Sequence, residues 1–199
     1  MARYAYLAAL VTFPLFLLNC ENDDPESEDP DIENIGTLIS QSASFSQFAN
    51  LISIADQEIP DGEQSVMEML NDPGNELTVF APSDATFERL AQEWSSPNFQ
   101  ASVSDVIAEF THSGQPAKTR DFVLGHIFKS QTRYESSQFQ NDLIFESQSG
   151  IRWRMIATDN ASSGYGLSLA AGSGNNPYLI YQTDLIQGGN GVVHEALVN

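Results

Sequence analysis

Few side chains in this sequence have the type and spacing that catalysis or metal binding requires. The three histidines, His112, His126 and His194, stand far apart and show no zinc-ligand spacing. Acidic residues are abundant, yet no D-x-D-x-D-G calcium loop occurs and no two carboxylates stand out as an acid–base pair. Ser83, next to Asp84, lacks the G-x-S-x-G turn that exposes a nucleophilic serine. The sequence therefore predicts no catalytic residues, no metal site and no cofactor.

One short segment concentrates positive charge, Arg152-Trp153-Arg154. On a strand, both arginines would lie on one face and Trp153 on the other. The functional interpretation is a contact surface for an anionic glycan, with Arg152 and Arg154 as candidate ligand-binding residues. The interpretation that we favour is a solvated face whose arginines pair with surplus acids while Trp153 packs in the core.

Two of the histidines have structural alternatives to a functional role. His126 is a third candidate ligand-binding residue, but Phe122 lies one helical turn before it, so His126 could instead sit on a semi-buried helix face. For His194 we expect a hydrogen-bonded structural role that joins the terminal strand to the domain, because it alternates with apolar residues.

The single cysteine, Cys20, follows an apolar run that is typical of a secretory signal. Residues 5–18 are mostly apolar and too few to span a bilayer, which needs about 20 residues. A cysteine directly after such a run resembles the lipobox of bacterial lipoproteins, in which the thiol is acylated. Asn19 departs from the Gly, Ala or Ser that is usual there. We therefore expect residues 1–19 to be a lipoprotein signal peptide with lipid on Cys20; a plain cleaved signal or an uncleaved membrane tether is the alternative.

Residues 20–34 are dominated by acidic side chains and two prolines, which cannot bury apolar area. This segment is predicted to be a disordered tether. In some Gram-negative lineages, acidic residues after a lipidated cysteine resemble a signal for export to the cell surface; a plain spacer is the alternative. The expected location is the cell envelope, with the chain lipid-anchored in the outer membrane and exposed at the surface.

The whole chain carries 27 acidic and 8 basic residues, a formal net charge of -19. Binding to phosphate backbones needs clustered Lys and Arg, so the composition argues against nucleic acid as a partner. With one cysteine, no disulfide can form within the chain.

The elements that must position these residues begin with a strand–turn–helix unit. Residues 77–81 are apolar, β-branched or aromatic, as in a buried strand, and Pro82 ends the run. Ser83 is expected to cap a helix whose apolar face carries Phe87, Leu90, Ala91 and Trp94.

The remaining pattern places helices before strands, which indicates an α+β fold. An S-x-x-Q sequence from Ser44 to Gln47 predicts a capping box, and Asn190-Gly191 predicts a hairpin. Expected helices cover residues 37–40, 45–52, 66–70, 103–110 and 120–128. Expected strands cover residues 142–147, 151–157, 165–170, 178–187 and 192–198, with a loop at 171–177 and a bend near Asp184.

Three segments in order resemble the signatures of the fasciclin (FAS1) domain. Residues 78–87, Thr-Val-Phe-Ala-Pro-Ser-Asp-Ala-Thr-Phe, resemble the family's "TVFAPTDxAF" block. Residues 184–186 and 190–194 resemble its "DI…NGVIH" block, and residues 124–127 stand where the family carries a Tyr-His motif. The resemblance covers residues 35–199, which we therefore take as one FAS1 domain.

The resemblance implies a wedge-shaped β-sandwich of about seven strands with several packed helices. Family members act in cell adhesion or in matrix and carbohydrate contact, and they are generally not enzymes. Gly125 stands where the family often has the Tyr that is linked to integrin contact, so the resemblance does not extend to that activity.

The function expected from these features is that of a membrane-anchored module for adhesion or ligand binding. Its partners would be the membrane, through the N-terminal lipid, and a protein or glycan ligand at the cell surface. An accessory binding protein of a polysaccharide-uptake system is the alternative, and a hydrolytic enzyme is a further one.

Overall fold

The computed structural model describes residues 32–130, 133–170 and 178–197. Cys20, the predicted signal peptide, nearly all of the predicted tether and the predicted loop at 171–177 lie outside the described residues. None of the helices within the described part of the chain combines the length and apolar character that crossing a bilayer requires.

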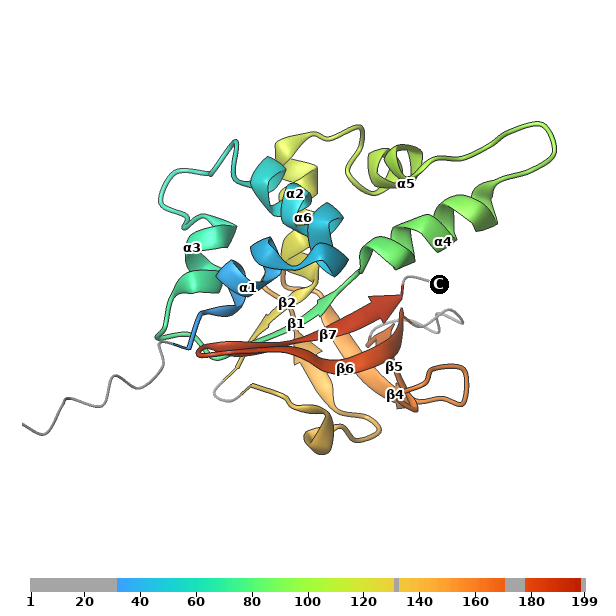
Figure 1. Ribbon diagram of the computed structural model, residues 1–199. Helices are drawn as coiled ribbons and strands as arrows, with labels where there is room; N and C mark the ends of the chain where they lie inside the picture. The colour runs from blue at the N-terminus through green and yellow to red at the C-terminus, as the bar shows by residue number, and fades with distance from the viewer. Residues whose placement is uncertain (1–31, 131–132, 171–177, 198–199) are drawn as a thin grey trace, which may run out of the picture. The chain divides into compact units, whose positions relative to one another are not determined.

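Helices occupy most of the first half of the described chain, and strands occupy most of the second half (Figure 1). The helices are α1 (Ile35–Gln41), α2 (Ser46–Ala55), α3 (Val66–Asn71), α4 (Asp84–Trp94), α5 (Val103–Phe110) and α6 (Pro116–Gly125), with short 3₁₀ turns η1 (Ala43–Phe45) and η2 (Ser136–Gln138). The strands are β1 (Leu77–Ala81), β2 (Ile127–Lys129), β3 (Ile144–Glu146), β4 (Arg152–Ala157), β5 (Tyr165–Leu169), β6 (Tyr178–Gly188) and β7 (Gly191–Leu197). The predicted α+β class is confirmed.

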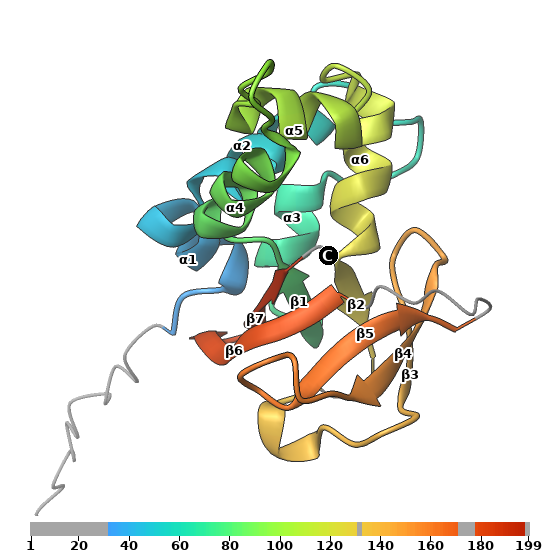
Figure 2. The same cartoon turned by 90° about the vertical axis from the view of Figure 1, so that its right-hand side faces the viewer.

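Within the described residues, the seven strands form one mixed sheet in the order β2-β1-β7-β6-β5-β4-β3. The β1–β7 pair is parallel and the other pairs are antiparallel. The sheet curls until its two ends meet, because Phe128 forms an antiparallel bridge with Ser147 and the Gln148 N–H donates to the Ile127 carbonyl at 2.8 Å. Figure 2 shows the helices stacked on one side of β1 and β7, with β3 to β5 turned away from them.

Two hydrophobic cores lie on opposite sides of β1. Val79 belongs to the core between the sheet and the helices, whereas its neighbour Phe80 belongs to the core enclosed by the curled sheet. Alternating side chains of a strand point to opposite faces, so a strand buried on both faces is apolar throughout. This explains the continuous apolar run of β1.

The strand–turn–helix unit forms as predicted at its start. The Ser83 hydroxyl accepts from the Thr86 N–H at 3.2 Å and caps α4, and Phe87 and Leu90 are buried. Trp94 was expected on the same buried face, but it is 39% exposed. The last turn of α4 projects beyond the core, so Trp94 covers only the edge of Phe110, with ring centroids 6.0 Å apart.

Two further local predictions were wrong. The expected helix at 120–128 is α6, which ends at Gly125 and is followed by β2; Pro116 occupies its first turn, where a missing N–H is tolerated. The expected capping box from Ser44 to Gln47 does not form, because Ser44 lies inside η1. Instead, the Asp84 carboxylate from α4 accepts from the Gln47 N–H at 2.8 Å and caps α2 from another element.

The β6–β7 hairpin is confirmed, and its turn joins the sheet to the helices. The Asn190 side chain is fully buried: its Oδ1 accepts from the Ile35 N–H at 2.9 Å, and its Nδ2 donates to the Leu70 carbonyl at 2.8 Å. A Cβ on Gly191 would lie 2.6 Å from the Leu77 carbonyl oxygen. Asn190 therefore serves the packing of α1 and α3, and Gly191 allows β7 to approach β1.

Candidate functional site

The two arginines of β4 lie on its exposed face, opposite the enclosed core. Trp153, between them, is 8% exposed, packs in that core and pairs with Phe145 of β3. Arg152 pairs in register with Glu146, and Arg154 with Ile144. The expected division of the segment, with arginines on one face and tryptophan on the other, is confirmed.

Neither arginine forms an ion pair with a described residue. Within the described residues, no carboxylate oxygen lies within 4.0 Å of Arg152 or Arg154, and the one polar contact is from Arg154 Nη2 to the Ala170 carbonyl at 3.5 Å. Trp153 is buried, as the alternative required, and Glu146 lies opposite Arg152 in register, although the two do not form a close ion pair.

Most other basic side chains in the described segments do form ion pairs. Arg89, Lys118, Arg120 and Arg133 each have a carboxylate within 4.0 Å. Lys129 of β2 does not, and it is exposed. Sequence reasoning missed Lys129, because only the bridge between Phe128 and Ser147 brings β2 next to β3.

Lys129 extends the positive surface onto a third strand. In antiparallel pairing the residue after Phe128 lies opposite the residue before Ser147, so Lys129 stands beside Glu146. Glu146 in turn stands beside Arg152. We call this surface the outer face of β3–β4; it consists of Lys129, Ile144, Glu146, Arg152, Arg154 and Ser168.

His126 is not part of this surface. It is 7% exposed and lies with Trp153 on the inner side of β4, where both line a small apolar cavity. Its Nδ1–H donates to the Phe122 carbonyl at 2.8 Å. Burial lowers the pKa of His126 to about 4, so the ring is neutral at pH 7. The structure thus places His126 apart from the arginines with which it was grouped as a candidate ligand-binding residue.

His194 is a fully buried structural histidine, as predicted. Its Nδ1 accepts from the Asp184 N–H at 3.0 Å, and its Nε2–H donates to the Tyr134 carbonyl at 2.8 Å. Burial lowers the pKa of His194 to about 4, and the hydrogen bond to Tyr134 only partly opposes this shift. The ring also stacks on Phe80, with centroids 5.0 Å apart.

Ser83 and Ser136, two described serines close to acidic side chains, form hydrogen bonds that join separate elements of the fold. Ser136, Asp184 and His194 have the residue types of a catalytic triad, but the Ser136 hydroxyl donates to the Asp184 carboxylate, and both His194 nitrogens bond to backbone groups. The Ser83 hydroxyl donates to the Glu195 carboxylate. Neither serine therefore has the adjacent histidine base that activation requires.

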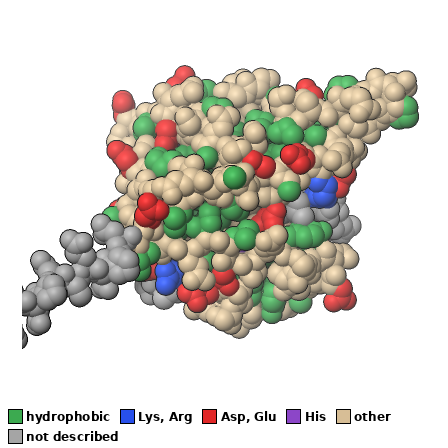
Figure 3. Space-filling view, in the orientation of Figure 1, with side chains coloured by type: hydrophobic (Ala, Val, Ile, Leu, Met, Phe, Trp, Pro, Cys, Tyr) green, Lys and Arg blue, Asp and Glu red, His purple; other side chains and the backbone are tan. Residues whose placement is uncertain are grey.

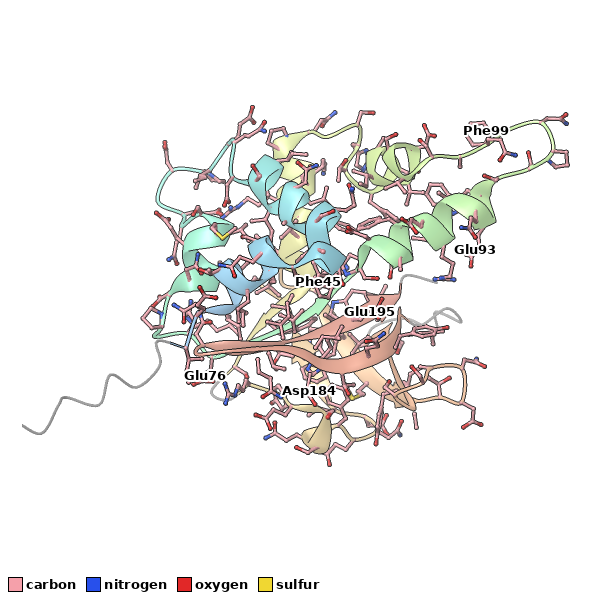
Figure 4. All side chains as sticks on the ribbon, in the orientation of Figure 1. Phe45, Glu76, Glu93, Phe99, Asp184 and Glu195 are labelled. Atoms are coloured by element: carbon pink, nitrogen blue, oxygen red, sulfur yellow. The ribbon has the colours of Figure 1, made fainter. Side chains whose placement is uncertain are left out.

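The acidic side chains of β6 and β7, Asp184 and Glu195, do not converge on a cation site. Figure 4 shows Asp184 and Glu195 well separated along these strands, and acidic side chains are scattered over the face in Figure 3. Within the described residues, no group of three or more His, Cys, Asp or Glu side chains is arranged to hold a metal ion.

A cavity of about 420 Å³ lies between α6 and the segment before α3. Arg120 lines it but is only 5% exposed: its guanidinium bonds Glu63 at 3.0 Å and lies 3.5 Å from Asp56. Asp56 also accepts from the Val66 N–H at 2.7 Å at the start of α3. The charges in this cavity therefore hold α3 and α6 together.

The fold defines the class of the protein: an α+β domain in which the described buried polar side chains bond to neighbouring elements. The family model for the fasciclin domain matches residues 43–195. The chain belongs to the fasciclin domain family.

Comparison with solved structures agrees on the fold. The chain is similar to a FAS1 domain pair from the insect cell adhesion molecule fasciclin I, with a TM-score of 0.59 and 10% sequence identity. The match covers 82% of this chain and 49% of that chain. No protein with a curated description matches the sequence closely enough to count as a relative.

Proposed function

We propose that this protein is a non-catalytic adhesion or ligand-binding module that works outside the cytoplasm. The observation that carries the proposal is the FAS1 domain itself, together with the structural use of Ser83, Ser136 and His194 described above. In such a module the contacts are made by exposed side chains on a rigid domain. The insect protein that shares the fold is described as a cell adhesion molecule, which supports the same general role.

The proposed anchor is a lipid on Cys20, followed by the acidic tether at residues 20–34. The apolar run that precedes the cysteine supports this proposal. Like charges along the tether repel one another and would keep the domain away from the membrane. The proposed location is the outer membrane, with the domain exposed at the cell surface.

Metabolic labelling with a fatty acid in a Gram-negative host tests the anchor. The expected result is label on the wild-type protein and none on a Cys20→Ser variant. Equal labelling of the two proteins would contradict the proposal.

The proposed partner is a protein or a glycan at the cell surface. An array of glycans and matrix proteins, probed with the complete protein in detergent, tests this part. The expected result is reproducible binding to a small set of ligands. Hydrolysis of an arrayed glycan, instead of binding, would contradict the non-catalytic assignment.

A further inference from the structure

The outer face of β3–β4 gathers three of the basic side chains of a chain in which acidic residues outnumber basic residues by 27 to 8. Lys129, Arg152 and Arg154 have no carboxylate within 4.0 Å among the described residues. Guanidinium groups are weakly hydrated and match planar oxyanions with two parallel hydrogen bonds. The guanidinium groups of Arg152 and Arg154, which are neighbours on one exposed face of β4, therefore suit a ligand that carries carboxylates.

The arrangement of the strands limits what kind of ligand can bind there. Arg152 and Arg154 are two residues apart on β4, which places their Cα atoms roughly 6.6 Å apart on one face. β4 lies between β3 and β5, so it has no free edge to which a peptide could add as a strand. The ligand must instead lie across the face and be held by side chains.

The neighbours of Arg154 add other contacts that a sugar could use. Ile144, opposite Arg154 on β3, is 42% exposed and offers apolar surface. Ser168, opposite Arg154 on β5, offers a hydroxyl group. A pyranose ring with a carboxylate has an apolar face, hydroxyl groups and one negative charge, and it complements all three side chains.

We propose that the outer face of β3–β4 is a binding surface for a glycan that carries carboxylate groups, of the uronic-acid class. This inference rests on the proposed function and names the ligand class for it. Arg152 and Arg154 hold the carboxylates, and Lys129 extends the surface for a second charged sugar. Because the chain carries a net charge of -19, binding is weakened by long-range repulsion and depends on these few local contacts.

Glu146 gives the proposal an internal test. It pairs in register with Arg152, and the Phe128–Ser147 bridge brings it near Lys129, so its carboxylate repels an anionic ligand. Replacing Glu146 by Gln should therefore strengthen binding, and improved binding cannot be produced by a misfolded variant.

The experiment measures binding of the complete protein in detergent to polygalacturonate by isothermal titration calorimetry, with neutral dextran as the comparison polymer. Wild type is expected to bind polygalacturonate and not dextran. Arg152→Gln combined with Arg154→Gln should weaken binding roughly tenfold or more, and Glu146→Gln should strengthen it about two- to fivefold. Arg89→Gln, which removes a half-buried arginine of α4, is the matched control and should leave binding unchanged.

Several outcomes would overturn the proposal. One is that the double arginine variant binds polygalacturonate as tightly as wild type, and another is that Glu146→Gln binds it more weakly. A third is that wild type binds poly-glutamate as tightly as polygalacturonate, which would indicate an acidic polypeptide as the ligand. If polygalacturonate does not bind while the array yields another ligand, this inference fails and the general function stands. If the array also yields none, the proposed function fails with it.

Discussion

The Nδ1 atom of His194 accepts a hydrogen bond from the backbone N–H of Asp184 at 3.0 Å. Asp184 lies ten residues earlier in the chain, on the neighbouring strand β6. Asp184 has a positive φ of 53°, and the register of β6 against β7 shifts on this part of the strand. The Asp184 carboxylate in turn accepts from the Ser136 N–H at 3.0 Å. The buried His194 ring thus stabilises the irregular part of β6 and, through Asp184, the segment around Ser136 that precedes β3.

Removing this ring should strongly destabilise the domain. His194→Ala leaves a cavity beside Phe80 and unpaired backbone groups at Asp184 and Tyr134, so we expect a loss of about 3–5 kcal/mol. Urea unfolding followed by tryptophan fluorescence measures it. His112→Asn, at a left-handed position that Asn tolerates, is the control and should change stability by less than about 0.5 kcal/mol. A loss below about 1 kcal/mol for His194→Ala would contradict the structural role.

Stability should fall as the pH is lowered from about 6.5 to about 4. The folded-state pKa values of His126 and His194 are lowered to about 4 by burial, whereas an unfolded chain binds their protons near 6.5. The unfolded state therefore takes up protons first, and each histidine accounts for a loss on the order of 3 kcal/mol across this window.

Urea unfolding at a series of pH values between 7.5 and 4.5 checks this pH dependence. A free energy of unfolding that stays constant between pH 6.5 and 5 would rule out neutral, buried rings.

Two glycine-to-alanine substitutions should have opposite effects. In Gly191→Ala the new Cβ would lie 2.6 Å from the Leu77 carbonyl oxygen, and backbone cannot move aside cheaply; we expect a loss of roughly 2–4 kcal/mol. In Gly125→Ala the nearest atom, Ser149 Oγ, is 3.7 Å away, so the helix should gain up to about 1 kcal/mol. Thermal unfolding compares the stability of both variants with that of wild type. If Gly191→Ala leaves the stability unchanged, β7 can move away from β1 to make room for the new Cβ, which contradicts the expected clash.

The ion pairs of Arg120 should matter more than those at the surface. Arg120→Ala leaves the Asp56 carboxylate without its partner in a mostly buried position, and we expect a loss of about 3 kcal/mol. Arg89→Ala breaks the exposed pair with Glu93 and should change stability by less than about 1 kcal/mol. Equal losses in chemical denaturation of the two variants would contradict this difference.

The parts of the fold that were predictable depend on neighbouring residues. Pro82 and Ser83 act within one turn of the chain, so the end of β1 and the start of α4 could be read from the sequence. The alternation around Trp153 likewise predicted which side chains of β4 face the core.

The parts that could not be predicted depend on residues that meet only after folding. Asp84 caps α2 although 37 residues separate it from Gln47, and no local pattern indicates this bond. Lys129 joins the candidate surface only because β2 meets β3. The arginines could be named from sequence, whereas the third cation and the opposing Glu146 required the sheet register.

The meeting of β2 and β3 at the Phe128–Ser147 bridge also affects how copies of this protein associate. Open sheet edges recruit strands from other chains, and proteins limit this hazard by shortening or covering them. Both outermost strands of the described sheet are three residues long and shield each other. Copies of the protein should therefore resist aggregation through strand pairing, even at high local concentration.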